Sequence, residues 1–528
     1  MRSYAGYLII LVAGLLCFVS GIGNAHLFDW DEINFAECAR EMIVSGNYSR
    51  MQIGFQPFWE KPPLFIWLQA LSMHVFGISA FAARLPNALI GTMALLVLYA
   101  YGRKNYDERM ARLWVLMYAG SYLSFFYFKS GIIDPLFNLL LFLSLMHLAG
   151  GTRRHVLMAG IFTGLAVLTK GPVAWLVIAS VLVLFTFISK EPLLKQLMQG
   201  FIWLAGSLFV TAIWFGYETV MHGTWFIETF ITYQIRLFTT KDAGHGGFLL
   251  YHWIILLLGM LPASVFFIAY LRRSGFRQPD HTAALLMIAF WVVLILFTIV
   301  KTKIVHYSSF CYYPISFFAA RYLADTTIPL PAVRRVFHLA LALLCLLGIV
   351  VLLFIYAASH PDLISPHIRD PFAVANLKAP VQWPVWLYLI PVSVLLVLVW
   401  TALRRSLSQG LYLMPIANTV LLFLLMLFVV PRVESITQGA YISLCEEFGP
   451  GGAYLQPYGF KSYAHLFYGN LHSEQCRYSA EELLSRPDIR GKKYLICKKG
   501  KEDELRKQPN TRELRETHGY YLFEVIEP

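Results

Sequence analysis

Charged residues are scarce in this 528-residue chain: Asp, Glu, Lys and Arg make up 14% of it, whereas 58% is hydrophobic. Soluble proteins carry roughly a quarter of charged residues. The deficit therefore excludes an ordinary soluble domain and places the chain among integral membrane proteins. A net charge of +12 would suggest nucleic-acid binding in a soluble protein. In a membrane protein, Lys and Arg held in cytoplasmic loops explain it more simply, and we expect no nucleic-acid partner.

The chain also lacks the common signatures of nucleotide and hydrolase sites. It has no Walker loop, no Rossmann glycine pattern, no HExxH and no nucleophile elbow in a suitable context. The seven cysteines are scattered, with no CxxC pair, so they do not predict a zinc site. Three of them, Cys445, Cys476 and Cys497, lie in the C-terminal tail. In an oxidising compartment two could pair, for example Cys445 with Cys476.

Long apolar runs are what the chain has in abundance. A bilayer core of about 30 Å needs about 20 mostly apolar residues per helix. About thirteen segments meet or approach this length: 4–22, 85–101, 113–128, 135–149, 156–168, 173–188, 201–220, 249–271, 283–300, 304–323, 336–357, 385–403 and 411–430. The first could instead be a cleaved signal peptide, with residues 23–25 resembling a cleavage site. We favour an uncleaved helix, and both interpretations place residue 23 onward outside.

Basic residues occupy every second loop and set the orientation. They include the pairs Arg103-Lys104, Arg153-Arg154, Arg272-Arg273 and Arg334-Arg335. The positive-inside rule makes these loops cytoplasmic. An odd number of helices then puts the N-terminus inside and the C-terminus outside.

Two regions outside the membrane are predicted to fold. The first outer loop, 23–84, carries a helical pattern over 30–48, which suits an interfacial amphipathic helix. A second apolar segment, 64–76, follows Pro62-Pro63 and is too short to span comfortably, so we interpret it as interfacial or re-entrant. The tail has strand-like runs at 493–497 and 520–526 and helix-like runs at 480–484 and 501–506. We therefore divide the chain into a membrane domain, 1–431, and a small outer α/β domain, 432–528.

Acidic residues gather on the outer side. Asp31 and Glu32 follow the first helix and could remove a proton from an attacking hydroxyl or bind a metal; solvated helix-capping acids are the simpler alternative. Asp134 begins a span, where the helix dipole alone would stabilise it. It nevertheless lies on the outer side at membrane depth, where ionisable groups are functional candidates.

Basic residues also lie on this side, against the positive-inside trend. Lys61 follows Trp59-Glu60 at a helix start and could hold a phosphate or form a surface ion pair. Lys170 ends a span, where snorkelling would explain it. Lys301 and Lys303, with His306-Tyr307, form a denser polar patch that would suit a phosphate or pyrophosphate group.

One further outer loop carries Arg236 and a histidine, His245, with glycines on both sides. These glycines would let the backbone approach a ligand closely. A loop histidine is usually only solvated, but with Glu60 it would make a partial metal site.

With these residues in hand, the chain resembles the bacterial branch of the protein O-mannosyltransferase superfamily, which includes the aminoarabinose transferases that modify lipid A. The matching pieces come in family order over roughly three-fifths of the chain: DE at 31–32, FAECAREM at 35–42, WEKPPL at 59–64, ARLPN at 83–87, IDP at 133–135, LTKGP at 168–172 and KTKIVHY at 301–307. Each piece alone is weak, and together they are specific.

The resemblance implies a GT-C glycosyltransferase fold, all-α in the membrane, with a catalytic first outer loop. The family moves a sugar from a polyprenyl phosphate to an acceptor with inversion; an outer-face enzyme has no nucleotide sugar, so a lipid-linked donor is expected. The acceptor would be a lipid A-like glycolipid or a protein. The location would be a bacterial inner membrane with the C-terminal domain in the periplasm.

The resemblance also implies roles for individual residues. Asp31 would be the catalytic acid, with Glu32 beside it, and Asp134 a second essential acid. Glu60 and His245 match positions that hold a divalent metal in the aminoarabinose transferases. Donor phosphate would be bound by Lys61, Arg84, Lys170, Arg236, Lys301 and Lys303, and substrate contacts would come from Trp59, His306 and Tyr307.

The chain departs from the family pattern at Asn34, where many relatives carry Arg, and this leaves the sugar and acceptor open. A secondary transporter is the alternative function. It fits the many helices and intramembrane charges, but transporters usually show paired repeats and mid-membrane charges. Here we find no repeat, and the charges cluster at one surface.

Overall fold

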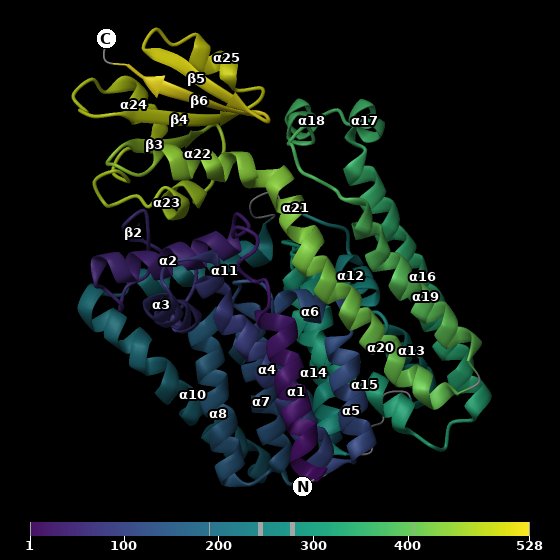
Figure 1. Ribbon diagram of the computed structural model, residues 1–528. Coiled ribbons are helices and arrows are strands. Elements are labelled where there is room, and N and C mark those ends of the chain that lie inside the picture. Colours follow the sequence, from purple (N-terminus) through teal and green to yellow (C-terminus); the bar gives the residue numbers. More distant parts are fainter. Residues whose placement is uncertain (1, 190, 241–245, 275–279, 405, 527–528) are drawn as a thin grey trace.

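The computed structural model describes residues 2–189, 191–240, 246–274, 280–404 and 406–526. It has three tiers (Figure 1): long helices in the lower part, two helices of the first outer loop across their upper end, and a sheet domain above them. The N-terminus lies at the far end of the long helices from the sheet domain.

The lower tier consists of helices from the membrane domain. Its elements are α1 (Arg2–Val19), α4 (Ala80–Asn105), α5 (Glu108–Ala119), α6 (Tyr122–Tyr127), α7 (Asp134–Gly150), α8 (Arg153–Lys170), α9 (Val173–Ile188), α10 (Leu193–His222), α11 (Trp225–Thr239), α12 (Tyr251–Gly259), α13 (Ala263–Ser274), α14 (His281–Ile299), η2 (Val305–Cys311), α15 (Tyr312–Ala324), α16 (Leu330–Ser359), α19 (Leu389–Leu403) and α20 (Leu407–Leu424). Short helices α17 (Pro361–Ile364) and α18 (Pro371–Asn376) connect α16 to α19.

Each predicted apolar segment falls on one helix or on two consecutive helices. By length and composition, six helices of the described chain could cross a membrane, and α12 with α13, bent by 112°, would make a seventh. The chain is thus a multi-pass membrane protein, while the number of about thirteen spans stays a prediction. Segment 113–128 is broken between α5 and α6 at Gly120. A Cβ there would lie 2.8 Å from the Leu116 carbonyl oxygen and from Pro415, so the close approach requires glycine.

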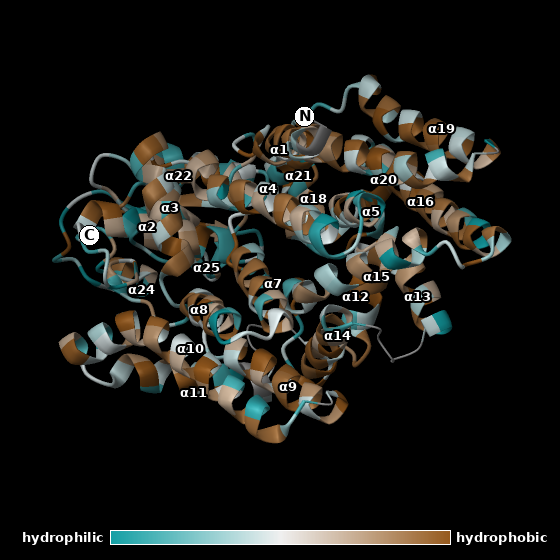
Figure 2. Ribbon diagram, turned by 90° about the horizontal axis from the view of Figure 1, so that it is seen from below, coloured by the Kyte–Doolittle hydropathy of each residue, from teal (hydrophilic) through white to brown (hydrophobic). Residues whose placement is uncertain are grey.

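Most residues of the long helices are hydrophobic, as the brown stretches of the ribbon in Figure 2 show. Helices α4 and α14 bury most of their apolar stretch inside the protein. Helices α10 and α16 instead leave most of theirs exposed, for example Phe209, Val220 and Leu353. Exposed apolar surface of this extent is expected where helices face lipid.

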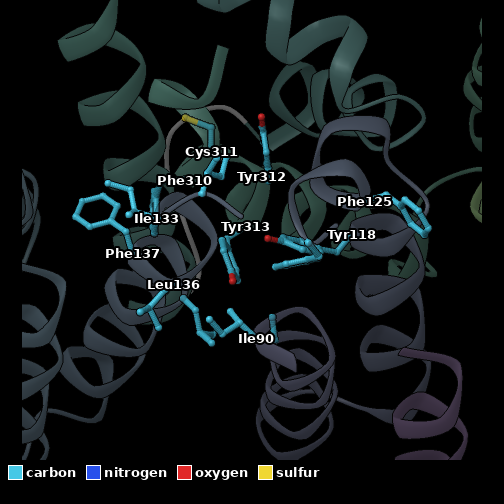
Figure 3. Close-up of a cluster of buried hydrophobic side chains, with 14 of the residues drawn as sticks. Ile90, Tyr118, Phe125, Ile133, Leu136, Phe137, Phe310, Cys311, Tyr312 and Tyr313 are labelled. Carbon is cyan, nitrogen blue, oxygen red and sulfur yellow. The ribbon is translucent and has the colours of Figure 1, made fainter. Parts of the chain in front are cut away.

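An aromatic core lies where α4, α5, α7 and α15 meet η2 (Figure 3). The ring of Tyr313 stacks on Phe142 with centroids 4.7 Å apart and lies 4.8 Å from Tyr118. A polar contact also joins α7 to η2 at this core, where Asn138 Nδ2 donates to Ser309 Oγ at 2.8 Å. Ile133 and Phe137 belong to this core, so the start of α7 is held by packing on both sides of Asp134.

The first outer loop folds as predicted into two helices, α2 (Asp31–Ser45) and α3 (Leu64–Phe76). A short hairpin, β1 (Gln52–Ile53) with β2 (Gln56–Pro57), lies between them. Residues Glu32 to Met42 of α2 are all buried. The expected interfacial helix is therefore covered, by α3 on one side and by the C-terminal domain on the other.

The C-terminal domain is the predicted small α/β unit. Its sheet has the order β3 (Tyr454–Tyr458), β4 (Lys493–Lys498), β6 (Tyr520–Val525) and β5 (Thr511–Thr517). Strand β3 is parallel to β4, and the other pairs are antiparallel. The helices are α22 (Ala440–Phe448), α23 (Ala464–Tyr468), α24 (Ala480–Ser485) and α25 (Glu502–Arg506).

No loop separates this domain from the membrane helices. One continuous helix runs from Leu407 to Phe448 through α20, α21 (Val430–Glu434) and α22. The division at 431/432 falls inside it and stays a prediction. All seven cysteines are free, so the suggested Cys445–Cys476 disulfide is not formed. Cys445 is buried on α22, whereas Cys476 lies beside Gly54 of the first outer loop.

Buried polar contacts fasten the domain to α2. Arg40 pairs with Glu37 through two hydrogen bonds of 2.6 and 2.7 Å, and both side chains are fully buried. Arg40 also donates to the Leu471 carbonyl at 2.8 Å. Nearby, the Tyr468 hydroxyl accepts a 2.6 Å hydrogen bond from the Leu27 amide. The C-terminal domain and the first outer loop therefore form one continuous structure.

Candidate active site

Two neighbouring chambers lie at the end of the long helices that is covered by α2 and the C-terminal domain (Figure 1). The inner chamber has about 810 Å³ of space, its mouth included, and is lined by Asp31, Lys61, Ile133, Asp134, Lys170, Val173, Tyr233, Gln234, Phe297, Val300, Thr302, Ile304, His306 and Tyr307. The outer chamber, about 1420 Å³, is lined by Phe28, Asp29, Trp30, Asp31, Glu32, Asn34, Glu60, Ile132, Tyr233, Arg236, Ile304, His306, Lys461 and Tyr463. Four residues line both chambers, and they include Asp31 and His306.

Two of the three predicted catalytic acids, Asp31 and Asp134, meet at this junction. His306 Nε2 lies 3.3 Å from Asp31 Oδ2 and 3.8 Å from Asp134 Oδ2. Lys170 Nζ donates to the other oxygen of Asp134 at 2.5 Å. Asp134 is 2% exposed and its Oδ2 has no hydrogen-bond partner among the described residues, whereas Asp31 is 37% exposed. A polar chain thus runs from the half-buried Lys170 through Asp134 and His306 to the more exposed carboxylate of Asp31.

Local structure explains these positions. Asp31 and Asp134 are the first residues of α2 and α7, where the helix dipole favours a carboxylate. Lys170 is the last residue of α8, and Gly171 after it has φ +96°, a value that favours glycine. His306 lies in η2, whose side chains form the core below.

Cations and one tyrosine ring surround the junction. Lys61 Nζ lies 5.2 Å from the centroid of the Tyr233 ring, and the Arg236 guanidinium lies 5.1 Å from it. The Tyr233 hydroxyl donates to Glu60 Oε2 at 3.2 Å. Lys170 Nζ lies 5.1 Å from the Tyr307 ring. The inner chamber therefore combines two ammonium groups with an apolar wall, a combination suited to a phosphate on an apolar chain.

Glu32 and Arg84 pair with each other. Arg84 donates to the carboxylate of Glu32 at 2.7 and 3.0 Å and to the carbonyls of Ile22, Ala25 and His26 at 2.7 to 2.8 Å. All five guanidinium donors are thereby used. Burial opposes the charged form of Glu32, but Arg84 and two backbone amides outweigh it and hold the pKa of this carboxyl below its ordinary value.

This pairing argues against the predicted roles of both residues. Arg84 has no donor left for a phosphate, and Glu32 is an anion fixed to Arg84, 5% exposed. We reassign the pair to positioning, because it fixes the loop before α2 and thus the place of Asp31.

Three other predicted residues lie away from the chambers. Lys303 is buried and its Nζ donates to the Phe297 and Thr298 carbonyls at 2.7 Å, so it caps the end of α14. Lys301 and Trp59 are exposed, and neither is among the residues that line the two chambers. The predicted donor-phosphate set is thereby reduced to Lys61, Lys170 and Arg236 on geometric grounds.

The predicted metal ligands are Glu60 and His245. Glu60 lines the outer chamber, whereas His245 lies outside the described residues. Within the described part of the chain, no three His, Cys, Asp or Glu side chains are arranged to hold a metal ion. The described residues thus do not make a site by themselves, and we derive no step through a metal.

Several lining residues were not predicted from the sequence, notably Tyr233, Trp30, Lys461 and Tyr463. Tyr233 lies among other aromatic residues of α11, and no spacing distinguishes it. Lys461 and Tyr463 come from the C-terminal domain and reach the site only through the tertiary fold.

Comparisons with known proteins agree with this architecture. Residues 60–215 match the family model of dolichyl-phosphate-mannose-protein mannosyltransferase. The undecaprenyl phosphate-alpha-4-amino-4-deoxy-L-arabinose arabinosyl transferase of Edwardsiella ictaluri is 26% identical over 62% of this chain and 61% of its own. A second such transferase, from Proteus mirabilis, is 23% identical over 61% of this chain and 60% of its own. The chain thus spans about three-fifths of the length of these curated relatives.

A solved structure covers almost the whole chain. The crystal structure of ArnT from Cupriavidus metallidurans bound to undecaprenyl phosphate superposes with a TM-score of 0.80 at 16% identity, over 99% of this chain and 98% of that chain. The fold is that of ArnT. The apo form of the same ArnT gives a TM-score of 0.81. The resemblance predicted from the sequence is therefore confirmed, and the ArnT-like fold includes the C-terminal domain.

Proposed function

We propose that this chain is a membrane glycosyltransferase that moves a sugar from a polyprenyl phosphate to an acceptor on the outer face of the membrane. The observation that carries the proposal is the junction of two chambers at Asp31 and His306. One chamber offers two lysines beside an apolar wall, as a lipid phosphate requires. The other opens outward, as an acceptor requires.

The donor would occupy the inner chamber. Its phosphate would lie near Lys61 and Lys170, and its prenyl chain would lie against apolar residues such as Val173, Phe297 and Val300. The sugar would then reach the junction. The names of the relatives, which are undecaprenyl phosphate-aminoarabinose transferases, and the ArnT complex with undecaprenyl phosphate support this donor class.

The reaction follows from these positions. An acceptor oxygen attacks the anomeric carbon from the face opposite the phosphate, which inverts that carbon. The bond from this carbon to the phosphate oxygen breaks, and its electron pair stays on the phosphate. Lys61 and Lys170 stabilise the added negative charge, so no general acid is needed. A hydroxyl acceptor loses its proton to Asp31, whereas a phosphate acceptor needs only orientation.

His306 and Asp134 would each hold a neighbouring side chain in position. His306 lies between the two carboxylates and would keep Asp31 oriented. Asp134 would hold Lys170 beside the donor phosphate. We further propose a lipid A-type acceptor, a bacterial inner membrane and a periplasmic C-terminal domain. A divalent metal at Glu60 and His245 remains part of the proposal without a role in the steps above.

Purified protein in liposomes tests the proposal. Vesicles receive undecaprenyl phosphate-aminoarabinose and lipid A, and mass spectrometry follows the sugar. We expect transfer by the wild type and its loss in Asp31→Asn and Asp134→Asn. Asp280→Asn is the control, because Asp280 is 37% exposed like Asp31, lies outside both chambers and caps a helix as Asn also does. Absent transfer with every donor tested, together with donor-independent solute flux, would favour the transporter.

A further inference from the structure

The outer chamber is closed on one side by the C-terminal domain. Lys461 and Tyr463 lie in the segment between β3 and α23 and line the chamber together with Trp30 and Asp31. Residues from opposite ends of the chain thus face one space. The same two regions are joined by the hydrogen bond between Leu27 and Tyr468, which lie 441 positions apart. A domain that served only as a cap would not need a cation at this place.

Lys461 is available to a ligand. Its side chain is exposed, and it forms no ion pair with a carboxylate of the described residues. Its Nζ lies 5.8 Å from the ring centroid of Trp30 and 5.2 Å from that of Tyr463. Aromatic rings attract an ammonium group without neutralising its charge as a carboxylate would. The charge of Lys461 thus stays available to an anionic ligand. Lys461 and Arg236 are the two cations among the described residues that line the outer chamber.

Trp30 has an unusual backbone. Its φ is +79° and ψ is −121°, a conformation that bulky residues rarely adopt. The side chain is 45% exposed even so. Strained backbone of this kind persists where the surrounding structure enforces it and clusters at ligand sites. Here the residue with this backbone lies directly before Asp31 and lines the outer chamber.

The segment that carries Lys461 is held firmly. Phe460 packs on Tyr441 with centroids 5.3 Å apart, and Lys498 lies 4.6 Å from the Phe460 ring. On the other side, the Ser462 hydroxyl accepts from the Ala464 amide at 3.1 Å. The ammonium group is therefore presented by a rigid wall, as selective recognition requires.

We propose that Lys461, with the rings of Trp30 and Tyr463, recognises the phosphorylated sugar headgroup of the acceptor. The ammonium binds the phosphate as a point charge, and the rings pack on the apolar face of the sugar. The C-terminal domain thus determines which acceptor reaches Asp31. This inference rests on the proposed function, since it assigns the acceptor side of that same site.

Binding without turnover tests the inference. Asp31→Asn protein in detergent is titrated with a phosphorylated glycolipid, with the same lipid after dephosphorylation and with polyprenyl phosphate, and native mass spectrometry measures each Kd. Adding Lys461→Gln should weaken binding of the phosphorylated glycolipid by roughly 10- to 100-fold, the usual range for a lost hydrogen bond to a charged group. Binding of the other two lipids should not change. Lys461→Arg should retain most of the affinity, and Lys507→Gln, an exposed lysine of the same domain, should have no effect.

Turnover and thermal unfolding complete the test. In wild-type background, Lys461→Gln should raise the acceptor KM and leave the donor KM and the unfolding temperature unchanged. An unchanged Kd and acceptor KM would overturn the inference, as would equal weakening of all three lipids with a lower unfolding temperature. If the wild type transfers no sugar, the proposed function fails, while the three Kd values still decide whether Lys461 binds a phosphorylated headgroup.

Discussion

Replacing Arg84 with methionine would remove five hydrogen-bond donors and one buried charge while keeping most of the side-chain volume. Glu32 would then be a buried anion whose remaining partners among the described residues are the amides of Phe28 and Gly131. Breaking one side of a buried ion pair costs about 3–5 kcal/mol. Three backbone carbonyls would lose their donor as well, so we expect the loss in the free energy of unfolding to lie towards the upper end of that range.

The matched control is Arg112→Met. Arg112 also pairs with a glutamate, Glu108, at 2.8 Å, but its side chain is 59% exposed. Exposed pairs contribute about 0–1 kcal/mol. A double variant, Glu32→Gln with Arg84→Met, removes both charges and should cost less than the sum of the two single changes, because neither partner is left as an unpaired charge.

Thiol reactivity provides the assay. All seven cysteines are free, and Cys38 of α2 is fully buried. A maleimide dye that reacts as the detergent-solubilised protein is heated therefore reports exposure of the four buried cysteines, Cys38 among them, above the labelling of the three half-buried cysteines at low temperature. We expect Arg84→Met to lower the apparent unfolding temperature clearly and Arg112→Met to leave it nearly unchanged. Activity at low temperature should fall through kcat, because Asp31 is displaced, rather than through the donor KM alone.

The opposite pattern would refute this reasoning. If the Arg84→Met and Arg112→Met proteins unfold at the same temperature, and Arg84→Met raises only the donor KM, then Arg84 binds the donor phosphate, as the resemblance implied. The buried pair would then be a resting arrangement that the donor opens.

Three further predictions separate roles in the same region. Lys170→Met should lower the transfer rate by about 10²–10³-fold, the usual loss for one charge-stabilising group. Lys303→Met should instead lower the free energy of unfolding by about 1–3 kcal/mol, because two carbonyls lose their donor, and should leave the donor KM unchanged. The reverse result would restore Lys303 to the phosphate site. Tyr233→Phe should cost less than tenfold in rate, because the ring beside the cations remains, and Tyr233→Ala should cost more. The hydrogen bond that His26 Nδ1 donates to the Glu434 carboxylate raises the pKa of His26. The unfolding temperature should therefore be highest below about pH 6.5 and should fall as pH rises through the raised value. His26→Gln should flatten this profile, and an unchanged slope would contradict it.

Local pattern was enough to predict most of the architecture. Apolar runs placed the membrane helices, Pro62-Pro63 marked the start of α3, and strand-like runs located β4 and β6. These features depend on residues that are close in sequence. The breaks at Gly120 and before α13 were not predicted, because they depend on what packs beside them.

The candidate site shows the limit of such reasoning. Lys170 and Lys303 each follow a threonine at the outer end of an apolar helix, and both were expected to bind phosphate. In the fold, Lys170 meets Asp134, 36 positions earlier, and enters the chamber. Lys303 instead turns back to the carbonyls at the end of α14, the helix that precedes it. Nothing in either local sequence distinguishes the two outcomes.

The same limit applies to Glu32 and Arg84, which lie 52 positions apart. Paired acids in sequence suggested two catalytic groups at Asp31 and Glu32. A helix turns by about 100° per residue, so neighbours face different directions, and only one of them reaches the chambers with a free carboxylate. Whether Asp31 or Glu32 has the free carboxylate depends on which of them pairs with Arg84, and therefore on where α4 places Arg84 relative to α2.

Helix α2 is held by two buried ion pairs, Glu32–Arg84 near its start and Glu37–Arg40 in its middle. Buried ion pairs are seldom the most stable way to fill a core, because desolvation offsets their attraction. Their directional hydrogen bonds do, however, fix one geometry. The first pair joins α2 to the membrane helices, and Arg40 of the second pair joins it to the C-terminal domain. Asp31 is thus located relative to both chambers at once, as attack by an acceptor from one chamber on a donor in the other requires.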